Sequence, residues 1–193
     1  MNTEFDDAPP ADEVREASEI ATRALALFAV VGTALGSPKA ETVQWLHAES
    51  LWDALSPEEV SFFTEEPRSE RQLVNASWRS EALLMLLWSL GAIDRLPGLN
   101  EQCSPGEFQA ILPPFAEVAV SEFIATAHRR SDVELLQMAE SLLNSHWEAR
   151  DARFNRRRMP SHLNIAIIQE RHHGINWVTG YEGLPWDEVT TDT

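Results

Sequence analysis

Apolar side chains recur along this chain at steps of three and four residues, which is the spacing of one face of an α-helix. The first such stretch runs from about Pro10 to Leu35, and Gly36 is expected to end it. A second helix is predicted to begin at Ser37 and Pro38. Its apolar residues are Val43, Trp45, Leu46, Trp52 and Leu55. The sequence contains no convincing alternation of apolar and polar residues, the pattern that would indicate a half-buried strand.

Three later helices are predicted to begin at capping boxes. In such a box a serine side chain caps the helix, and a glutamate or glutamine three residues later bonds back to the backbone of the serine. The boxes pair Ser56 with Glu59, Ser69 with Gln72, and Ser131 with Glu134. The first is expected to open a short helix, the second a helix to about Leu90, and the third a helix to about Arg157. Residues 82–88 are apolar on every side, which is typical of the buried centre of a helical domain.

The remaining segments complete an all-α prediction. Further helices are predicted after Ser104, over residues 115–129, and from Asn164 to about Tyr181. Residues 182–193 are expected to form a coil that packs through Trp186, and residues 1–9 a disordered acidic arm. Residues 10–193 are therefore predicted to form a single irregular domain of about six to eight helices with a packed C-terminal tail.

The helix opened by the third capping box changes character along one face. Its apolar stripe continues into His146, Arg150 and Arg153, which lie at steps that keep them on the same side of a helix. An unpaired charge on a core-facing stripe lowers the stability of the fold by several kcal/mol, on the order of the loss of a buried ion pair. We therefore expect the acidic tail, through Asp187 and Asp192, to meet the two arginines.

The formal net charge is −16, and residues 1–70 carry much of it, with 15 acidic and 4 basic side chains. A surface this acidic repels phosphate groups, so nucleic-acid and anionic-membrane binding are not expected. It would suit a basic protein partner, although acidity also serves solubility. The acidic N-terminus lacks the basic region of a signal peptide, and the apolar run 24–35 is short for a membrane span. These features predict a cytoplasmic protein.

Polar residues of the C-terminal half, together with one from the predicted central helix, could form a functional centre. The set is Glu81, His146, Arg150, Asp151, Arg153, Glu170, His172, Asn176, Asp187 and Asp192. Because a histidine near a carboxylate can act as a general base, the catalytic candidates are His146, Asp151, Glu170 and His172. Arg150, Arg153 and Asn176 are candidates for binding an anionic ligand. The alternative is a buried ion network that only fixes how the last two helices and the tail dock.

No cofactor or metal is expected. Cys103 stands alone, so a cysteine-built metal site is impossible, and Glu170 with His173 is the single Glu-x-x-His pair, whereas di-iron bundles use two. The basic block Arg153–Arg158 could suggest a nucleic-acid patch, but cations are favourable at the end of a helix and the acidic tail could pair with them.

Several short motifs resemble, in order, a bacterial family known as domain of unknown function 4272. They are Arg79–Leu83, Leu87–Gly91, His146–Arg153, Glu170–Trp177 and Trp186–Thr193. The resemblance covers about residues 20–193 and implies a fold and a bacterial origin, without an established activity.

Two functions follow as hypotheses from the sequence. One is a protein-interaction module with a structural His/Arg/Asp centre, whose contact face is the acidic N-terminal third. The other is an enzyme or small-anion binder centred on His146, Arg150, Arg153 and His172. A polar centre that is open to solvent would favour the second hypothesis, and a closed network would favour the first.

Overall fold

The computed structural model describes residues 13–192, and within this range the chain forms seven α-helices, four short 3-10 segments and no strand. The α-helices are α1 (Ala17–Ala34), α2 (Lys39–Ala48), α3 (Pro57–Thr64), α4 (Glu70–Ser89), α5 (Val120–Ala125), α6 (Asp132–Phe154) and α7 (Ile165–Val178). The 3-10 segments are η1 (Trp52–Ala54), η2 (Pro105–Ala110), η3 (Tyr181–Gly183) and η4 (Trp186–Glu188). The predicted all-α single domain is confirmed. The predicted disordered arm of residues 1–9 lies outside the described residues.

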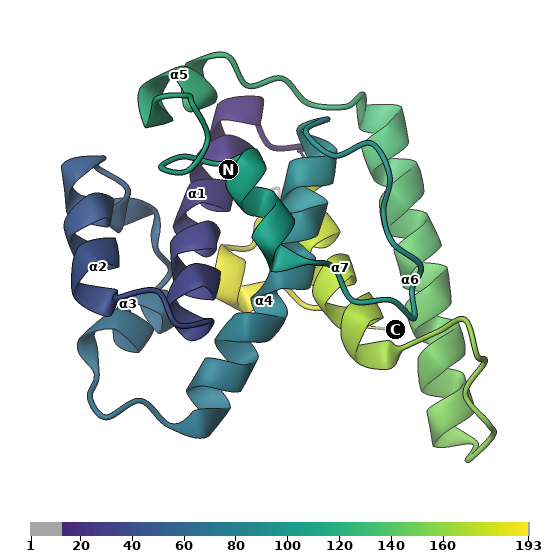
Figure 1. Cartoon of the computed structure of the whole chain (residues 1–193). Coiled ribbons are helices and arrows are strands. Elements are labelled where there is room, and N and C mark those ends of the chain that lie inside the picture. Colours follow the sequence, from purple (N-terminus) through teal and green to yellow (C-terminus); the bar gives the residue numbers. More distant parts are fainter. Residues whose placement is uncertain (1–12, 193) are drawn as a thin grey trace, which may run out of the picture.

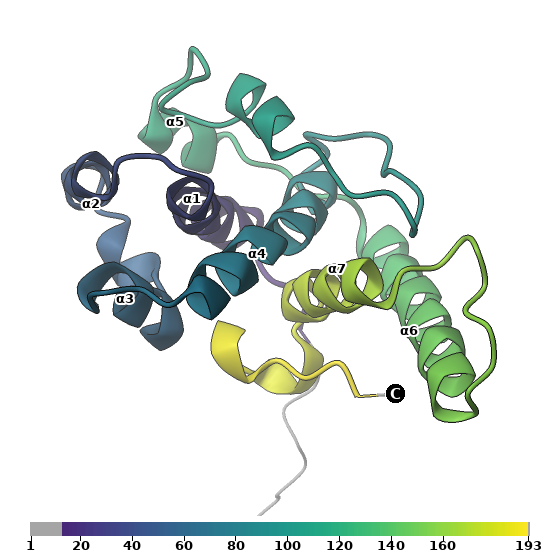
Figure 2. The ribbon, with the colours of Figure 1, turned by 60° about the horizontal axis from the view of Figure 1, so that its bottom comes forward.

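Helix α4 lies at the centre of the domain, with α1 packed on one side and α7 on the other. Helix α6 packs against α7, so that α1, α4, α7 and α6 follow one another across the molecule (Figure 2). Residues 82–88 of α4 are buried on every side, as their composition predicts. Helix α1 has the length and composition of a membrane span, and 67% of it is buried within the fold, as in the core helix of a globular domain.

The crossing of α4 and α7 depends on Gly174. A Cβ atom at this position would lie 2.9 Å from the carbonyl oxygen of Ala82 and 3.1 Å from the Cβ atom of Met85. These distances are shorter than ordinary van der Waals contacts, so only glycine lets the two backbones approach this closely. The close approach brings the polar residues of α7 up against α4.

The predicted helix starts are confirmed where a side chain caps the helix. Ser56, Ser69 and Ser131 each accept a hydrogen bond from the backbone N–H three residues later, and the reciprocal bond of the capping box is present in each. The side chain of Asn164 accepts from the N–H of Ala166 at 3.0 Å and begins α7. These starts were predictable because a cap involves residues only two or three positions apart.

The predicted start of the first helix is wrong. Helix α1 begins at Ala17 rather than near Pro10, because the preceding described residues bond to the end of α7 instead. The backbone N–H of Arg15 donates to the carbonyl oxygen of Val178, and its side chain donates to that of Trp177 at 2.8 Å.

The second helix is also shorter than predicted. Helix α2 ends at Ala48, where Ser50 takes a left-handed conformation and Leu51 turns into the core. The N–H of Leu51 bonds to the carbonyl oxygen of Leu46, which satisfies the end of the helix as in a Schellman motif. Trp52 therefore lies in the separate segment η1.

Three further boundaries differ from the prediction. Residues 115–129 are helical only in α5, and Phe115 belongs to an irregular segment. The ring of Phe115 packs edge-on against that of Phe28, with the ring centroids 6.0 Å apart. Helix α6 ends at Phe154, since Arg156 adopts a left-handed conformation and closes the helix. Ser104 precedes a 3-10 segment and makes no side-chain cap.

The C-terminal tail is part of the fold, as predicted from Trp186. That indole is 5% exposed and packs edge-on against Trp177 and His173, while the guanidinium of Arg23 stacks 4.6 Å above it. Asn176 holds the tail further on by donating to the carbonyl oxygen of Thr190 at 3.0 Å.

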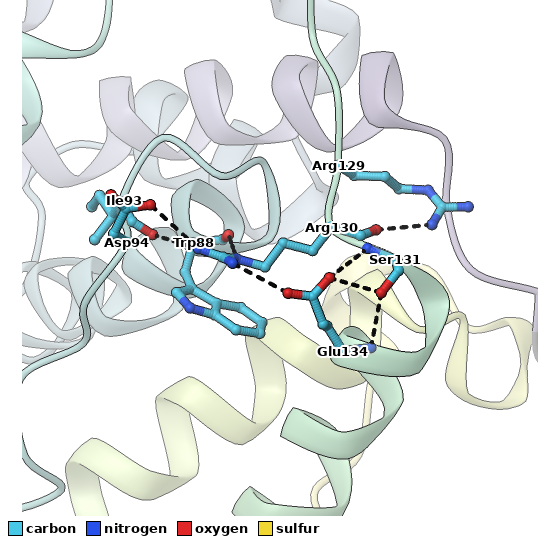
Figure 3. A network of polar contacts seen from close by, with 7 residues as sticks. All are labelled: Trp88, Ile93, Asp94, Arg129, Arg130, Ser131 and Glu134. Atoms are coloured by element: carbon cyan, nitrogen blue, oxygen red, sulfur yellow. Dashed lines mark hydrogen bonds and ion pairs between the residues drawn. The ribbon is translucent and has the colours of Figure 1, made fainter.

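A network of polar contacts joins the end of α4 to the start of α6 (Figure 3). The guanidinium of Arg130 lies 4.6 Å from the ring centroid of Trp88 and donates to the carbonyl oxygens of Trp88 and Ile93. It also pairs with Glu134, which closes the capping box of α6. The network fixes the position of α6 relative to the core.

Candidate functional site

The polar residues predicted to share one centre lie in separate environments. Glu81 lies in a buried ion pair, His146 and His172 form a buried histidine pair, and Glu170 faces a cleft. The predicted buried positions of Arg150 and Arg153 are wrong, because both side chains are exposed. Each environment has its own geometry.

The buried ion pair joins α4 to α7 at the centre of the domain. Arg171 and Glu81 are 0% and 1% exposed, and the Nε atom of Arg171 donates to Glu81 at 2.8 Å. The guanidinium also donates to the carbonyl oxygens of Pro97 and Glu101, at 2.7 and 3.0 Å. The second carboxylate oxygen of Glu81 accepts from the backbone N–H of Cys103 at 2.7 Å. This closed network holds the loop before η2 to the core.

Arg171 belongs to this network but was not among the candidates predicted from the sequence. It lies four residues after Ile167 and four before Ile175, both fully buried, so it occupies the apolar stripe of α7. A cation on such a stripe was the available signal that a buried carboxylate faces it. Burial and the neighbouring Glu81 raise the pKa of the Cys103 thiol to about 12, so the thiol is protonated near pH 7.

His146 of α6 and His172 of α7 form a buried pair, 3% and 2% exposed, with their Nδ1 atoms 3.1 Å apart. A hydrogen bond between two Nδ1 atoms requires one ring to carry its proton there and the other ring to carry it on Nε2. Burial, followed by the neighbouring His146, lowers the pKa of His172 to about 4. Burial, followed by the charge of Arg150, lowers the pKa of His146. Both rings are therefore neutral near pH 7.

A solvent-open groove of about 460 Å³ begins at His146. It is lined by His146, Arg150, Arg153 and Phe154 of α6, Ile165 and Gln169 of α7, and Thr191 of the tail. The groove exists because the buried face of α6 continues through Ala149 and Ala152, which turns the two arginines outward beside the first turns of α7. Among these described lining residues none is a carboxylate, although the whole chain carries a net charge of −16.

The predicted pairing of the tail with the arginines is wrong for Asp187. This carboxylate accepts from the backbone N–H of Glu58 at 2.9 Å and so caps the first turn of α3. An acceptor there satisfies an N–H group that has no partner within its own helix. The next part of the tail does reach the groove, through Thr191. Asp151, a catalytic candidate, pairs with Arg157 and accepts from Asn155 at 2.6 Å, beside the end of α6.

Glu170 lies in a separate cleft of about 520 Å³ between α3, α4, α7 and the tail. Its carboxylate pairs with Arg79 at 3.3 Å, and burial raises its pKa against the opposing effect of that arginine. The walls combine both signs of charge with the aromatic rings of Trp78 and Trp186. The contact joins α4 to α7 and places this carboxylate in a different opening from His146.

His173 and Arg23 are further buried polar residues that were not among the candidates. Burial, followed by the charges of Arg79 and Arg23, lowers the pKa of His173 to about 3. Arg23 pairs with Glu59 of α3 and donates to the carbonyl oxygen of Ala54 at 2.8 Å.

Across residues 13–192, no group of three or more His, Cys, Asp or Glu side chains has a geometry that could hold a metal ion.

Comparison with known proteins places these features in one family. A family model described as Domain of unknown function (DUF4272) matches residues 5–189. No curated protein and no solved structure matches the chain. The matched range contains all seven α-helices and both histidines of the buried pair, and it ends just before Thr191.

Proposed function

We propose that this chain, which belongs to the DUF4272 family, binds a small ligand carrying a carboxylate or phosphate group in the groove between α6, α7 and the tail. The observation that carries the proposal is the lining of the groove. In a strongly acidic protein, Arg150 and Arg153 face an opening whose other described walls are neutral. Residues 150–158 concentrate this charge further, with five arginines and one aspartate.

The side chains of the groove match the chemistry of an anionic group. A guanidinium offers a planar pair of donors that fits the two oxygens of a carboxylate or phosphate. Gln169 and Thr191 add neutral donors, and Phe154 offers an apolar wall to the rest of a ligand. Ile165 is the first residue of α7, so the positive end of that helix dipole also lies at the groove.

The buried histidine pair supports the groove from beneath. His146 lies at its floor and contacts the ring of His172, which holds its orientation. Because its pKa is lowered, His146 presents a neutral ring near pH 7, which can exchange a hydrogen bond with a ligand without adding a charge. Binding is the function that this arrangement supports, since an orienting pair of arginines and a neutral imidazole suffice for it.

The test is calorimetric titration of the protein with inorganic phosphate and with succinate. Replacing Arg153 with alanine should weaken binding about tenfold or more, because a charge-assisted hydrogen bond contributes about 1.5–3 kcal/mol. Arg158→Ala is the matched control, since it removes the same charge from an exposed residue outside the groove lining. Absence of binding by both anions, or equal weakening by the two substitutions, would overturn the proposal.

The role of His146 is tested with the same ligands. His146→Ala should weaken binding modestly and lower the melting temperature, because it removes a buried contact with His172. If a bound compound is instead converted, and the substitution reduces the rate about 10²–10⁴-fold in a folded protein, His146 acts as a general base and the site is an enzyme.

A second proposed function, association with a basic protein partner, rests on the surface of α2, α3 and the start of α4. Its exposed acidic side chains are Glu41, Glu49, Asp53, Glu58, Glu65, Glu66 and Glu70. Acidic surface accelerates encounters with a basic partner and makes the rate depend on salt. Pull-downs at low and high salt test this: recovery of a basic protein at low salt alone would support it, and recovery of none would count against it.

A further inference from the structure

Helix α6 carries a row of exposed residues that follows the spacing of a coiled coil. The row, named here the α6 stripe, consists of Val133, Leu136, Glu140, Leu143, Trp147, Arg150 and Phe154. Successive members are alternately three and four residues apart, which gives a period of 3.5 residues and a straight seam along the helix. Trp147 is 60% exposed and Phe154 88%, so large apolar side chains stand in solvent.

The stripe is separate from the face of α6 that packs on the domain. Leu135, Leu142 and Ala149 are buried against the rest of the fold, whereas the stripe lies on another side of the helix. Helix α6 runs along one edge of the molecule (Figure 1), and every member of the stripe is exposed. Exposed apolar residues arranged as a continuous seam, rather than scattered singly, mark an interaction surface.

The two charged members of the stripe decide which occupant fits. In a parallel, in-register pair of stripes, Glu140 would face the partner's Glu140, and Arg150 would face the partner's Arg150. In an antiparallel pair, a residue at one heptad position of the seam faces the other position of the second helix. One such register places Leu143 opposite the partner's Trp147, and Glu140 opposite the partner's Arg150.

The same register places Leu136 opposite the partner's Phe154, and two-fold symmetry repeats each contact. Every apolar member from Leu136 onward then meets an apolar residue, and the one acid meets the one base. We propose that the α6 stripe binds a second copy of this chain, antiparallel and in this register, to form a symmetric dimer. A two-fold interface requires such self-complementarity of one surface.

The residues beside the seam are compatible with this arrangement. Gln137 and Asn144 follow the stripe on one side, and Ala139 and the buried His146 precede it on the other, so no like charges meet near the centre. Aromatic side chains bury about 150–250 Å² each when covered, so the exposed parts of Trp147 and Phe154 in two copies supply roughly 450–750 Å². With the leucines added, the interface approaches the roughly 1,000 Å² expected of a specific contact.

Sedimentation equilibrium of the full chain tests the proposal over concentrations of about 1–100 µM, the range in which a dimer of moderate affinity dissociates. The unmodified chain should be dimeric at the upper end and dissociate on dilution. Trp147→Glu should weaken association at least about tenfold, as expected for a central aromatic residue. Val74→Glu is the matched control, because Val74 is an exposed apolar residue of α4, 46% exposed and outside the stripe.

A charge swap tests the register. Glu140→Arg should weaken association because it places two arginines opposite each other twice, and the double variant with Arg150→Glu should restore it. Both residues are exposed, so circular dichroism should show folded variants. A monomer at every concentration, unchanged association of Glu140→Arg, or no recovery in the double variant would overturn the proposal. The inference does not rest on anion binding. Since Arg150 and Phe154 belong to both the groove and the α6 stripe, the charge swap is scored by association alone.

Discussion

Replacing Arg171 with methionine would remove the cation from the centre of the domain while keeping a long, flexible side chain. Arg171 is fully buried and donates to Glu81, Pro97 and Glu101 at 2.8, 2.7 and 3.0 Å. After the substitution, the carboxylate of Glu81 would stay buried, with the backbone N–H of Cys103 as its hydrogen-bond donor. The loop of residues 97–101 would lose its donors at the same time.

The expected loss of stability is large. Removing one partner of a buried ion pair costs about 3–5 kcal/mol, because the other charge is left without compensation. Each lost hydrogen bond to the loop adds about 0.5–1.5 kcal/mol. Since domains are stable by only about 5–15 kcal/mol, Arg171→Met should remove a substantial part of the free energy of unfolding. Arg171→Lys keeps the charge but not the planar fork, so its free energy of unfolding should lie between that of the wild type and that of Arg171→Met.

The assay is urea unfolding of the wild type, Arg171→Met, Glu81→Leu and the double variant at pH 7. Removing Glu81 as well eliminates the uncompensated charge. The double variant should therefore lose at least about 1 kcal/mol less free energy of unfolding than the two single losses added together. A loss below about 1 kcal/mol for Arg171→Met, or strictly additive losses, would refute the reasoning.

Three other predictions concern stability. Gly174→Ala should destabilise the domain by about 1–3 kcal/mol in urea unfolding, because the added methyl group meets the α4 backbone, and an unchanged midpoint would contradict the close crossing. Removing residues 186–193 should cost several kcal/mol, roughly 2–3 of them from the buried indole, far more than trimming a frayed end; matching midpoints of the full and truncated chains would show that the tail contributes nothing. Burial lowers the pKa of His172 from 6.5 to about 4 and that of His173 from 6.5 to about 3, so the unfolded chain binds more protons between these values. The part of the stability that depends on these two rings should therefore be complete above pH 6.5 and fall as the pH drops toward 3. A slope that His172→Asn leaves unchanged would show that the His172 ring is not responsible.

The sequence predicted the helices best where the signal is carried by neighbours. The capping boxes at Ser56, Ser69 and Ser131 name their own partners three residues away, and all three are present. The end of α2 was missed because its signal lies in the tertiary position of Leu51, which turns into the core. Ser50, which precedes Leu51, adopts the left-handed conformation, and a serine does not signal a helix end in the sequence as a glycine does.

For the candidate site, the sequence misjudged how the polar residues combine, because the structure places them in separate environments. His146 was predicted on the core-facing side of α6 and is buried, whereas Arg150 and Arg153 follow it in spacing but face the groove. The reason is that, in the part of α6 that follows His146, only Ala149 and Ala152 are buried. A helical period places residues on a side of the helix, but the neighbouring element decides how wide the covered side is.

By itself, the sequence determined the all-α class, the helix starts capped by Ser56, Ser69, Ser131 and Asn164, and the burial of Trp186. These depend on interactions within a few residues or on the cost of leaving an indole in water. Only the tertiary structure decided that Arg171 meets Glu81, 90 positions away, and that Asp187 caps α3 instead of pairing with the arginines. These pairings depend on how α4 and α7 cross at Gly174 and on the path that the buried Trp186 imposes on the tail. A charge can pair with any opposite charge that the fold brings within reach, so its partner follows from packing rather than from spacing.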